Sequence, residues 1–103
     1  MDLPSFKKAA SAGRIEWRRH AYQRMVERGS SRETVVDALL TGDLVEDYPD
    51  AAPYPAVLLV SKYEPPIHVV ASFDAISNVA FVITVYEPDL VHFLPGFRQR
   101  RQP

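Results

Sequence analysis

The hydrophobic pattern of the chain changes at Gly42 from a helical period to a period of two. Before Gly42, apolar residues recur at intervals of three and four, as they do on one face of a helix. After it, short segments either alternate or are apolar throughout, and prolines separate them, as is typical of strands. Helices followed by consecutive strands predict an α+β fold, in which N-terminal helices pack on one face of an antiparallel sheet of about four strands.

Residues that commonly begin and end helices divide the first part of the chain into three. Ser30 and Glu33 have the spacing of a capping box, with Ser30 as the N-cap and Glu33 reaching back to it. Gly13, Gly29 and Gly42 stand where the helical patterns end. The expected helices cover 4–12, the residues between Trp17 and Gly29, and the residues between Ser30 and Gly42.

The second part of the chain contains four segments that resemble strands. Residues 56–60 are apolar throughout and predict a buried central strand, whereas residues 67–73 alternate. The expected strands cover 44–48, 56–60, 67–73 and 79–86. No linker or repeat interrupts the pattern, so we expect one domain over 1–103, with an N-terminal helical segment at 1–13 and a flexible basic tail at 98–103.

Composition excludes several kinds of site. The chain has no cysteine, so it can form neither disulfides nor thiolate metal sites. Its histidines, His20, His68 and His92, do not have the short spacing of a metal motif, and we expect no metal and no cofactor. No apolar run approaches the roughly 18 residues of a membrane span, which favours a cytoplasmic protein without membrane contact.

Charge is unevenly distributed along the chain. The net charge of −1 argues against a simple electrostatic nucleic-acid binder. Residues 14–32, however, hold six arginines against two glutamates, whereas residues 43–50 hold four acidic residues and no basic one. This charge distribution is explained equally well by a local positive patch and by charges that are simply solvated over the surface.

The helix expected between Trp17 and Gly29 carries two neighbouring stripes. Trp17, Ala21 and Met25 recur every four residues and would face a core. The adjacent stripe is formed by His20, Arg24 and Arg28. Like charges four residues apart cost a helix about 0.2–0.5 kcal/mol, so helix stability does not explain the two arginines. A row of cations beside a titratable histidine suits a phosphate group.

An ion-paired surface is the alternative interpretation of this stripe. Glu16 can pair with His20, and Glu27 can pair with Arg24. On most helices such a stripe is an ion-paired surface. A convergence of the stripe with other polar residues would favour the phosphate site.

His68, Thr84 and Tyr86 lie on two neighbouring expected strands, and the register decides whether they share a face. If Phe73 opposes Val79, His68 opposes Thr84 and all three side chains point the same way. In the other register Asp74 opposes Val79, and His68 then opposes Val85. Hydrophobic patterning favours the first, because it places Ile67, Val69, Ala71 and Phe73 with Val79, Phe81, Ile83 and Val85 on one apolar face. Without the other polar residues, the simpler interpretation of His68 is a structural one, a histidine that forms hydrogen bonds at the surface of the sheet.

Convergence of these groups would permit metal-independent RNA cleavage. Two imidazoles can act as general base and general acid at neutral pH. Arginines can stabilise charge on a phosphoryl group. RNA supplies its own nucleophile, the 2′-hydroxyl, and the reaction leaves a 2′,3′-cyclic phosphate.

Four motifs resemble those of a family of small bacterial proteins long catalogued as a domain of unknown function. They are His-Ala-x-x-Arg-Met-x-Glu-Arg-Gly at 20–29, Gly-Asp-Leu-Val-Glu-Asp-Tyr-Pro at 42–49, Ile-His-Val-Val-Ala at 67–71 and Ile-Thr-Val-Tyr-Glu-Pro-Asp at 83–89. The family is grouped with the barnase–EndoU–colicin–RelE superfamily of metal-independent ribonucleases. The resemblance implies a RelE- or barnase-like fold and the toxin of a bacterial toxin–antitoxin pair. Its cognate antitoxin would be a small protein with a zinc-binding Cys motif and a helix-turn-helix.

The resemblance also implies a set of site residues. The matching polar positions are His20, Arg24, Arg28, His68, Thr84, Tyr86 and Arg98. We expect His20, His68 and Tyr86 to be catalytic, and Arg24, Arg28, Thr84 and Arg98 to bind phosphate. The alternative is a non-catalytic protein- or RNA-binding module on the same fold, which the net charge favours slightly.

Overall fold

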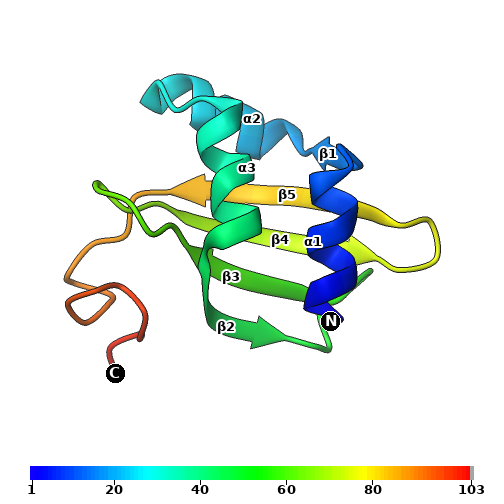
Figure 1. Ribbon diagram of the computed structural model, residues 1–103. Helices are drawn as coiled ribbons and strands as arrows, with labels where there is room; N and C mark the ends of the chain where they lie inside the picture. Colours follow the sequence, from blue (N-terminus) through cyan, green and yellow to red (C-terminus); the bar gives the residue numbers. More distant parts are fainter. Residues whose placement is uncertain (103) are drawn as a thin grey trace.

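The computed structural model describes residues 1–102 and confirms the α+β fold (Figure 1). Its elements are α1 (Leu3–Ser11), β1 (Ile15–Trp17), α2 (Arg19–Arg28), α3 (Arg32–Thr41), β2 (Asp43–Tyr48), β3 (Ala56–Val60), β4 (His68–Asp74) and β5 (Val79–Tyr86). The strands form one sheet in the order β1-β5-β4-β3-β2. Within the described residues, no helix is long and apolar enough to cross a membrane.

The sheet has five strands rather than the four expected, because β1 adds an edge strand. β1 runs parallel to β5, and Ile15 lies opposite Ala80. All the other neighbouring strands are antiparallel. Trp17 therefore belongs to a strand and not to the helical stripe predicted from its spacing, although it packs against the same core. Three residues are too few to show a period in the sequence.

The turn between α2 and α3 differs by one residue from the predicted capping box. Gly29 has a φ of 68° and ends α2, and the Ser30 amide donates to the Met25 carbonyl. Ser30 is therefore part of the end of α2. The N-cap of α3 is Ser31, whose hydroxyl oxygen accepts a hydrogen bond from the Thr34 amide at 3.1 Å.

Gly42 joins α3 to β2 where the backbone passes closest to β3. A Cβ at this position would lie 2.4 Å from the Ala38 carbonyl oxygen and 2.7 Å from the Val60 carbonyl oxygen. The predicted helix stop at Gly42 is confirmed, but its φ of −65° is ordinary. Glycine is required here by the close approach of two backbones and not by a left-handed conformation.

The core lies between the helices and one face of the sheet. Figure 1 shows α1 and α3 over this face, with α2 running along the β5 side of the sheet. Phe6, Met25 and Leu39 supply large buried side chains from the three helices. The sheet contributes Val57, Leu59, Val69, Ala71, Phe73, Ala80, Val82 and Val85 to this core.

A β-bulge between β4 and β5 makes the predicted register wrong. Near the loop, Asp74 lies opposite Val79, and after the bulge His68 lies opposite Tyr86. The extra residue of β5 at this point is Ile83. As a result, Phe81 is opposite Ser72, away from the helices. The core positions predicted for Val79, Phe81 and Ile83 are taken instead by Ala80 and Val82.

The bulge nevertheless brings the predicted polar residues to one face. Thr84 is opposite Val70, and Tyr86 is opposite His68, so His68, Thr84 and Tyr86 share the sheet face that points away from the helices. Two segments cover parts of this face. The β2–β3 loop places Tyr54 on Phe81, with ring centroids 5.4 Å apart. The C-terminal segment, residues 87–102, covers His68.

Candidate functional site

His68 lies at the start of β4, and both of its ring nitrogens are hydrogen-bonded. Nδ1 is 3.0 Å from the Tyr86 hydroxyl, and Nε2 is 2.8 Å from the Phe97 carbonyl oxygen. A carbonyl can only accept, so Nε2 carries the proton and donates it. Nδ1 of the neutral ring then accepts from the Tyr86 hydroxyl. This set of bonds satisfies the imidazole completely.

Burial keeps this pair uncharged. His68 is fully buried, and its removal from water lowers the pKa of the imidazole below the ordinary value of 6.5. Burial likewise raises the pKa of the Tyr86 hydroxyl above its ordinary value of 10.0. At neutral pH the structure therefore contains a neutral imidazole and a protonated phenol.

The C-terminal segment closes over His68 with an aromatic side chain. The Phe93 ring meets the imidazole edge-on at a centroid distance of 4.5 Å and is itself buried. The Arg100 guanidinium lies 4.8 Å from the Phe93 ring centroid and forms two hydrogen bonds to Glu46 of β2. Arg100 thus connects the segment to the far edge strand of the sheet.

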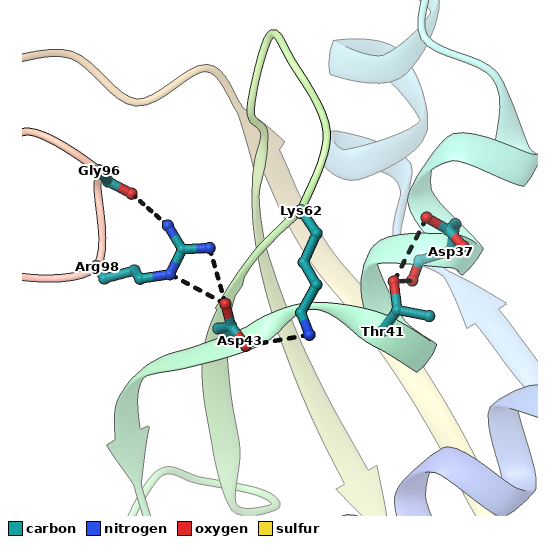
Figure 2. A network of polar contacts seen from close by, with 6 residues as sticks. All are labelled: Asp37, Thr41, Asp43, Lys62, Gly96 and Arg98. Atoms are coloured by element: carbon teal, nitrogen blue, oxygen red, sulfur yellow. Dashed lines mark hydrogen bonds and ion pairs between the residues drawn. The ribbon is translucent and has the colours of Figure 1, made fainter.

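Arg98, predicted to bind phosphate, pairs with an acidic residue of the same edge strand. Its Nε and Nη2 donate to Asp43 Oδ2 at 3.0 and 2.8 Å. Figure 2 shows Asp43 between Arg98 and Lys62, whose ammonium nitrogen is 3.7 Å from Asp43 Oδ1. Arg98 and Arg100 of the predicted basic tail thus both contact β2, and Pro103 lies outside the described residues. The prediction missed this because the partner acids are far away in sequence.

The predicted stripe of α2 divides into an exposed part and a half-buried part. His20 and Arg24 are exposed, as a substrate-facing row requires. Arg28 is only 22% exposed, and its Nη2 is 3.1 Å from Glu87 Oε2. The buried Nε of Arg28 has no hydrogen-bond partner among the described residues. Because Glu87 directly follows Tyr86, this ion pair ties the C-terminal end of α2 to the end of β5.

The structure brings some of the predicted residues together and not others. Tyr86 and His68 are bonded, and Thr84 lies on the same face. Within residues 1–102, neither His20 nor Arg24 forms a hydrogen bond or ion pair with His68 or Tyr86. The Glu16–His20 and Glu27–Arg24 pairs of the alternative interpretation are likewise not formed among these residues. Arg98 belongs to the opposite edge of the sheet, with β2.

Sequence reasoning missed the groups that enclose His68. The Phe97 carbonyl and the Phe93 ring come from a segment without clear periodicity, and no local signal assigned them a partner. The nearest available signal was the charge pattern, since a basic tail and an acidic strand are natural partners.

The sequence profile of one protein family matches residues 17–87. The family is described as Domain of unknown function (DUF4258). The chain belongs to this family. The matched range begins at Trp17 on β1 and ends at Glu87, so it includes α2, β4 and β5 with all the predicted site residues except Arg98. The chain has no significant match among curated proteins or among solved structures.

Proposed function

We propose that this protein is a metal-independent endoribonuclease and the toxin of a bacterial toxin–antitoxin pair. The observation that carries the proposal is the exposed row of His20 and Arg24 on α2, which the Arg28–Glu87 ion pair ties to the strand that bears Tyr86. An accessible imidazole, a cationic group and a protonated phenol are the components that phosphodiester cleavage needs. The resemblance of the motifs to ribonuclease toxins supports the same function.

In the proposed reaction the RNA 2′-oxygen attacks the adjacent phosphorus, and the bond from phosphorus to the 5′-oxygen breaks. His20, as the accessible imidazole, takes the proton of the 2′-hydroxyl. Arg24 balances the charge that develops on the phosphoryl oxygens, and Arg28, which Glu87 holds, keeps the end of α2 next to β5. The Tyr86 hydroxyl turns its proton from His68 Nδ1 to the leaving 5′-oxygen and donates it there, and Thr84 on the same face donates a hydrogen bond to the phosphate. The products are a 2′,3′-cyclic phosphate and a 5′-hydroxyl.

His68 acts in this scheme through Tyr86 and does not touch the RNA. Its burial and its two hydrogen bonds leave no ring nitrogen for a substrate. Its role is to hold the phenol in place, as a positioning residue. This replaces the pair of acting histidines expected from the sequence, and Arg98 has no part in the scheme because Asp43 holds it.

The purified protein tests the reaction directly. We expect it to cleave single-stranded RNA, but not DNA of the same sequence, in excess EDTA. His20→Ala should reduce the rate by about 10²–10⁴-fold, as expected for loss of a general base. His92→Ala is the matched control, since His92 is also exposed but contacts Asp89 in the C-terminal segment. Loss of activity on chelation, or products that end in a 3′-hydroxyl, would contradict the mechanism.

Expression in bacteria tests the toxin assignment. A cytoplasmic toxin should arrest growth, and a small zinc-binding antitoxin expressed with it should restore growth and copurify with it. His20→Ala should relieve the arrest without preventing copurification. Normal growth on expression of folded protein would contradict the assignment.

A non-catalytic protein- or RNA-binding module is the second candidate. The complete burial of His68 favours it, because one of the two expected catalytic imidazoles serves the fold. Analysis of the RNA ends distinguishes the two candidate functions. A binding module should retain RNA or a protein partner without forming cyclic phosphate ends, and His20→Ala should not change any product.

A further inference from the structure

The sheet face opposite the helices contains a hollow with a volume of about 270 Å³. Its floor is formed by Val70, Ser72 and Ile83, and so includes the bulge residue of β5. Tyr48 and Tyr54 line its wall, and Arg18 stands at the start of α2 on another side. The hollow thus has a floor of two apolar residues and one serine, two tyrosines in its wall and one cation.

Two polar groups of the hollow are available to a ligand. Ser72 lines the hollow, and its hydroxyl forms no side-chain hydrogen bond among residues 1–102. Arg18 is exposed, and its guanidinium lies 4.7 Å from the centroid of the Phe81 ring. Stacking on the ring face holds this cation in place and leaves its N–H groups free to donate. A hydroxyl that lines the hollow without a bonded partner can donate to or accept from a polar ligand.

The size and lining favour one flat heterocycle. The volume is several times the roughly 30 Å³ that one water occupies in the liquid, but it lies just below the roughly 300–1,000 Å³ of typical ligand pockets. Aromatic walls bind unstacked bases through their faces, and a hydroxyl can bond to a base edge. An arginine at the rim suits the phosphate of the same nucleotide.

The hollow is continuous with the proposed cleavage site. Val70 of its floor pairs with Thr84, and the next residues along both strands lead to the His68–Tyr86 pair. Arg18 at its rim precedes His20 by two residues. A chain of nucleotides can therefore place one base in the hollow while the adjacent phosphate lies near Tyr86 and α2.

We infer that this hollow binds one unpaired base of single-stranded RNA, with Arg18 on the phosphate of that nucleotide and the Ser72 hydroxyl on the base edge. The inference rests on the proposed function, since it assumes an RNA substrate. A nucleotide within RNA and a free nucleotide both carry a base on a ribose phosphate, so the hollow could bind either. Experiments with both kinds of ligand separate the two sources.

Binding of a cleavage-resistant oligonucleotide measures the hollow without the reaction. The probe is a fluorescent single-stranded 2′-O-methyl RNA, compared with a strand of the same length whose bases are absent. We expect the strand without bases to bind about tenfold more weakly, in keeping with the loss of base stacking. Adenosine monophosphate should shift the amide resonances of Val70 and Ser72, and ribose 5-phosphate should not.

Three variants locate the contact. Ala51→Phe, at the lining of the hollow, should lower affinity for the complete strand to that for the strand without bases. Ser72→Val should weaken binding several-fold, and its fold can be checked by its amide spectrum. Arg18→Ala should weaken binding of both strands. Arg32→Ala is the matched control, since its guanidinium also stacks on an aromatic ring, that of Trp17 at 5.5 Å, but lies outside the hollow.

The outcomes separate this inference from the proposed function. Equal affinity for the strands with and without bases, or unchanged binding by folded Ala51→Phe, would overturn the hollow as a base site even if RNA is cleaved. Base-dependent binding that Ala51→Phe abolishes supports it even if no cleavage occurs. Binding of adenosine monophosphate without binding of RNA would contradict the claim that the bound base belongs to an RNA strand.

Discussion

At the scale of single residues, His68 shows how one side chain can join three segments. Its ring connects β4 to Tyr86 of β5 and to the Phe97 carbonyl of the C-terminal segment. Each bond satisfies a polar group in a buried environment, where an unpaired group would cost about 1–3 kcal/mol. A charged imidazole would carry a proton on Nδ1 as well, so the Tyr86 hydroxyl would have to turn and accept that hydrogen bond instead of donating it.

Stability should therefore depend on pH through His68. The pKa of His68 is below 6.5 in the native state because of burial, so the unfolded chain binds the proton first as pH falls. The free energy of unfolding should be greatest above about pH 6.5 and decrease below it, by at most about 1.4 kcal/mol per pH unit for one proton. Urea unfolding of the wild type and of His68→Gln between pH 5 and 8 measures this. An equally steep decrease in both proteins would assign the effect to other groups.

At the scale of elements, the C-terminal segment is a structural part of the sheet. It contributes Phe93 to the face opposite the helices, and Arg98 and Arg100 fasten it to β2. These ion pairs are partly exposed, so each adds little by itself. The buried Phe93 ring is the main contact that holds the segment in place.

Phe93→Ala should release this segment and open His68 to solvent. Truncation of a buried Phe costs about 3–5 kcal/mol, which exceeds what the exposed ion pairs can offset. Reaction of His68 with diethyl pyrocarbonate, followed by mass spectrometry, should become much faster in the variant. Leu90→Ala changes an exposed residue of the same segment and should leave the rate unchanged. A protected His68 in Phe93→Ala would show that other contacts cover it.

At the scale of the whole molecule, the fold rearranges the charges of a nearly neutral chain. Two of the acids between residues 43 and 50 pair with arginines of the C-terminal segment, namely Asp43 with Arg98 and Glu46 with Arg100. The exposed arginines Arg18, the N-cap of α2, and Arg24, within α2, form no such ion pairs among the described residues. A protein with a net charge of −1 can thus present a positive surface on one side.

RNA affinity should reveal the size of this surface through its salt dependence. Each phosphate that the protein neutralises changes the slope of log K against log salt by about −0.7 for single strands. Arg24→Ala should make the slope less negative by about that amount, whereas Arg98→Ala should not change it, because Arg98 is held by Asp43. Titrations of a 2′-O-methyl strand at several salt concentrations give both slopes. A slope altered by Arg98→Ala alone would place the RNA near β2.

The sequence by itself determined the fold class, the three helices, four of the five strands and the stop at Gly42, because periodicity and helix termini are local properties. It also placed His68 and Tyr86 on one face of the sheet. The register assumed for this was wrong, because the bulge at Ile83 shifts the pairing of β4 and β5. Only the tertiary structure decided that His68 is enclosed and that Arg98 is paired. Those outcomes depend on contacts between residues 29 and 55 positions apart, which no local pattern encodes. The hollow could not be predicted for the same reason, since its lining comes from the N-cap residue of α2, the β2–β3 loop and four strands that meet only in the folded chain.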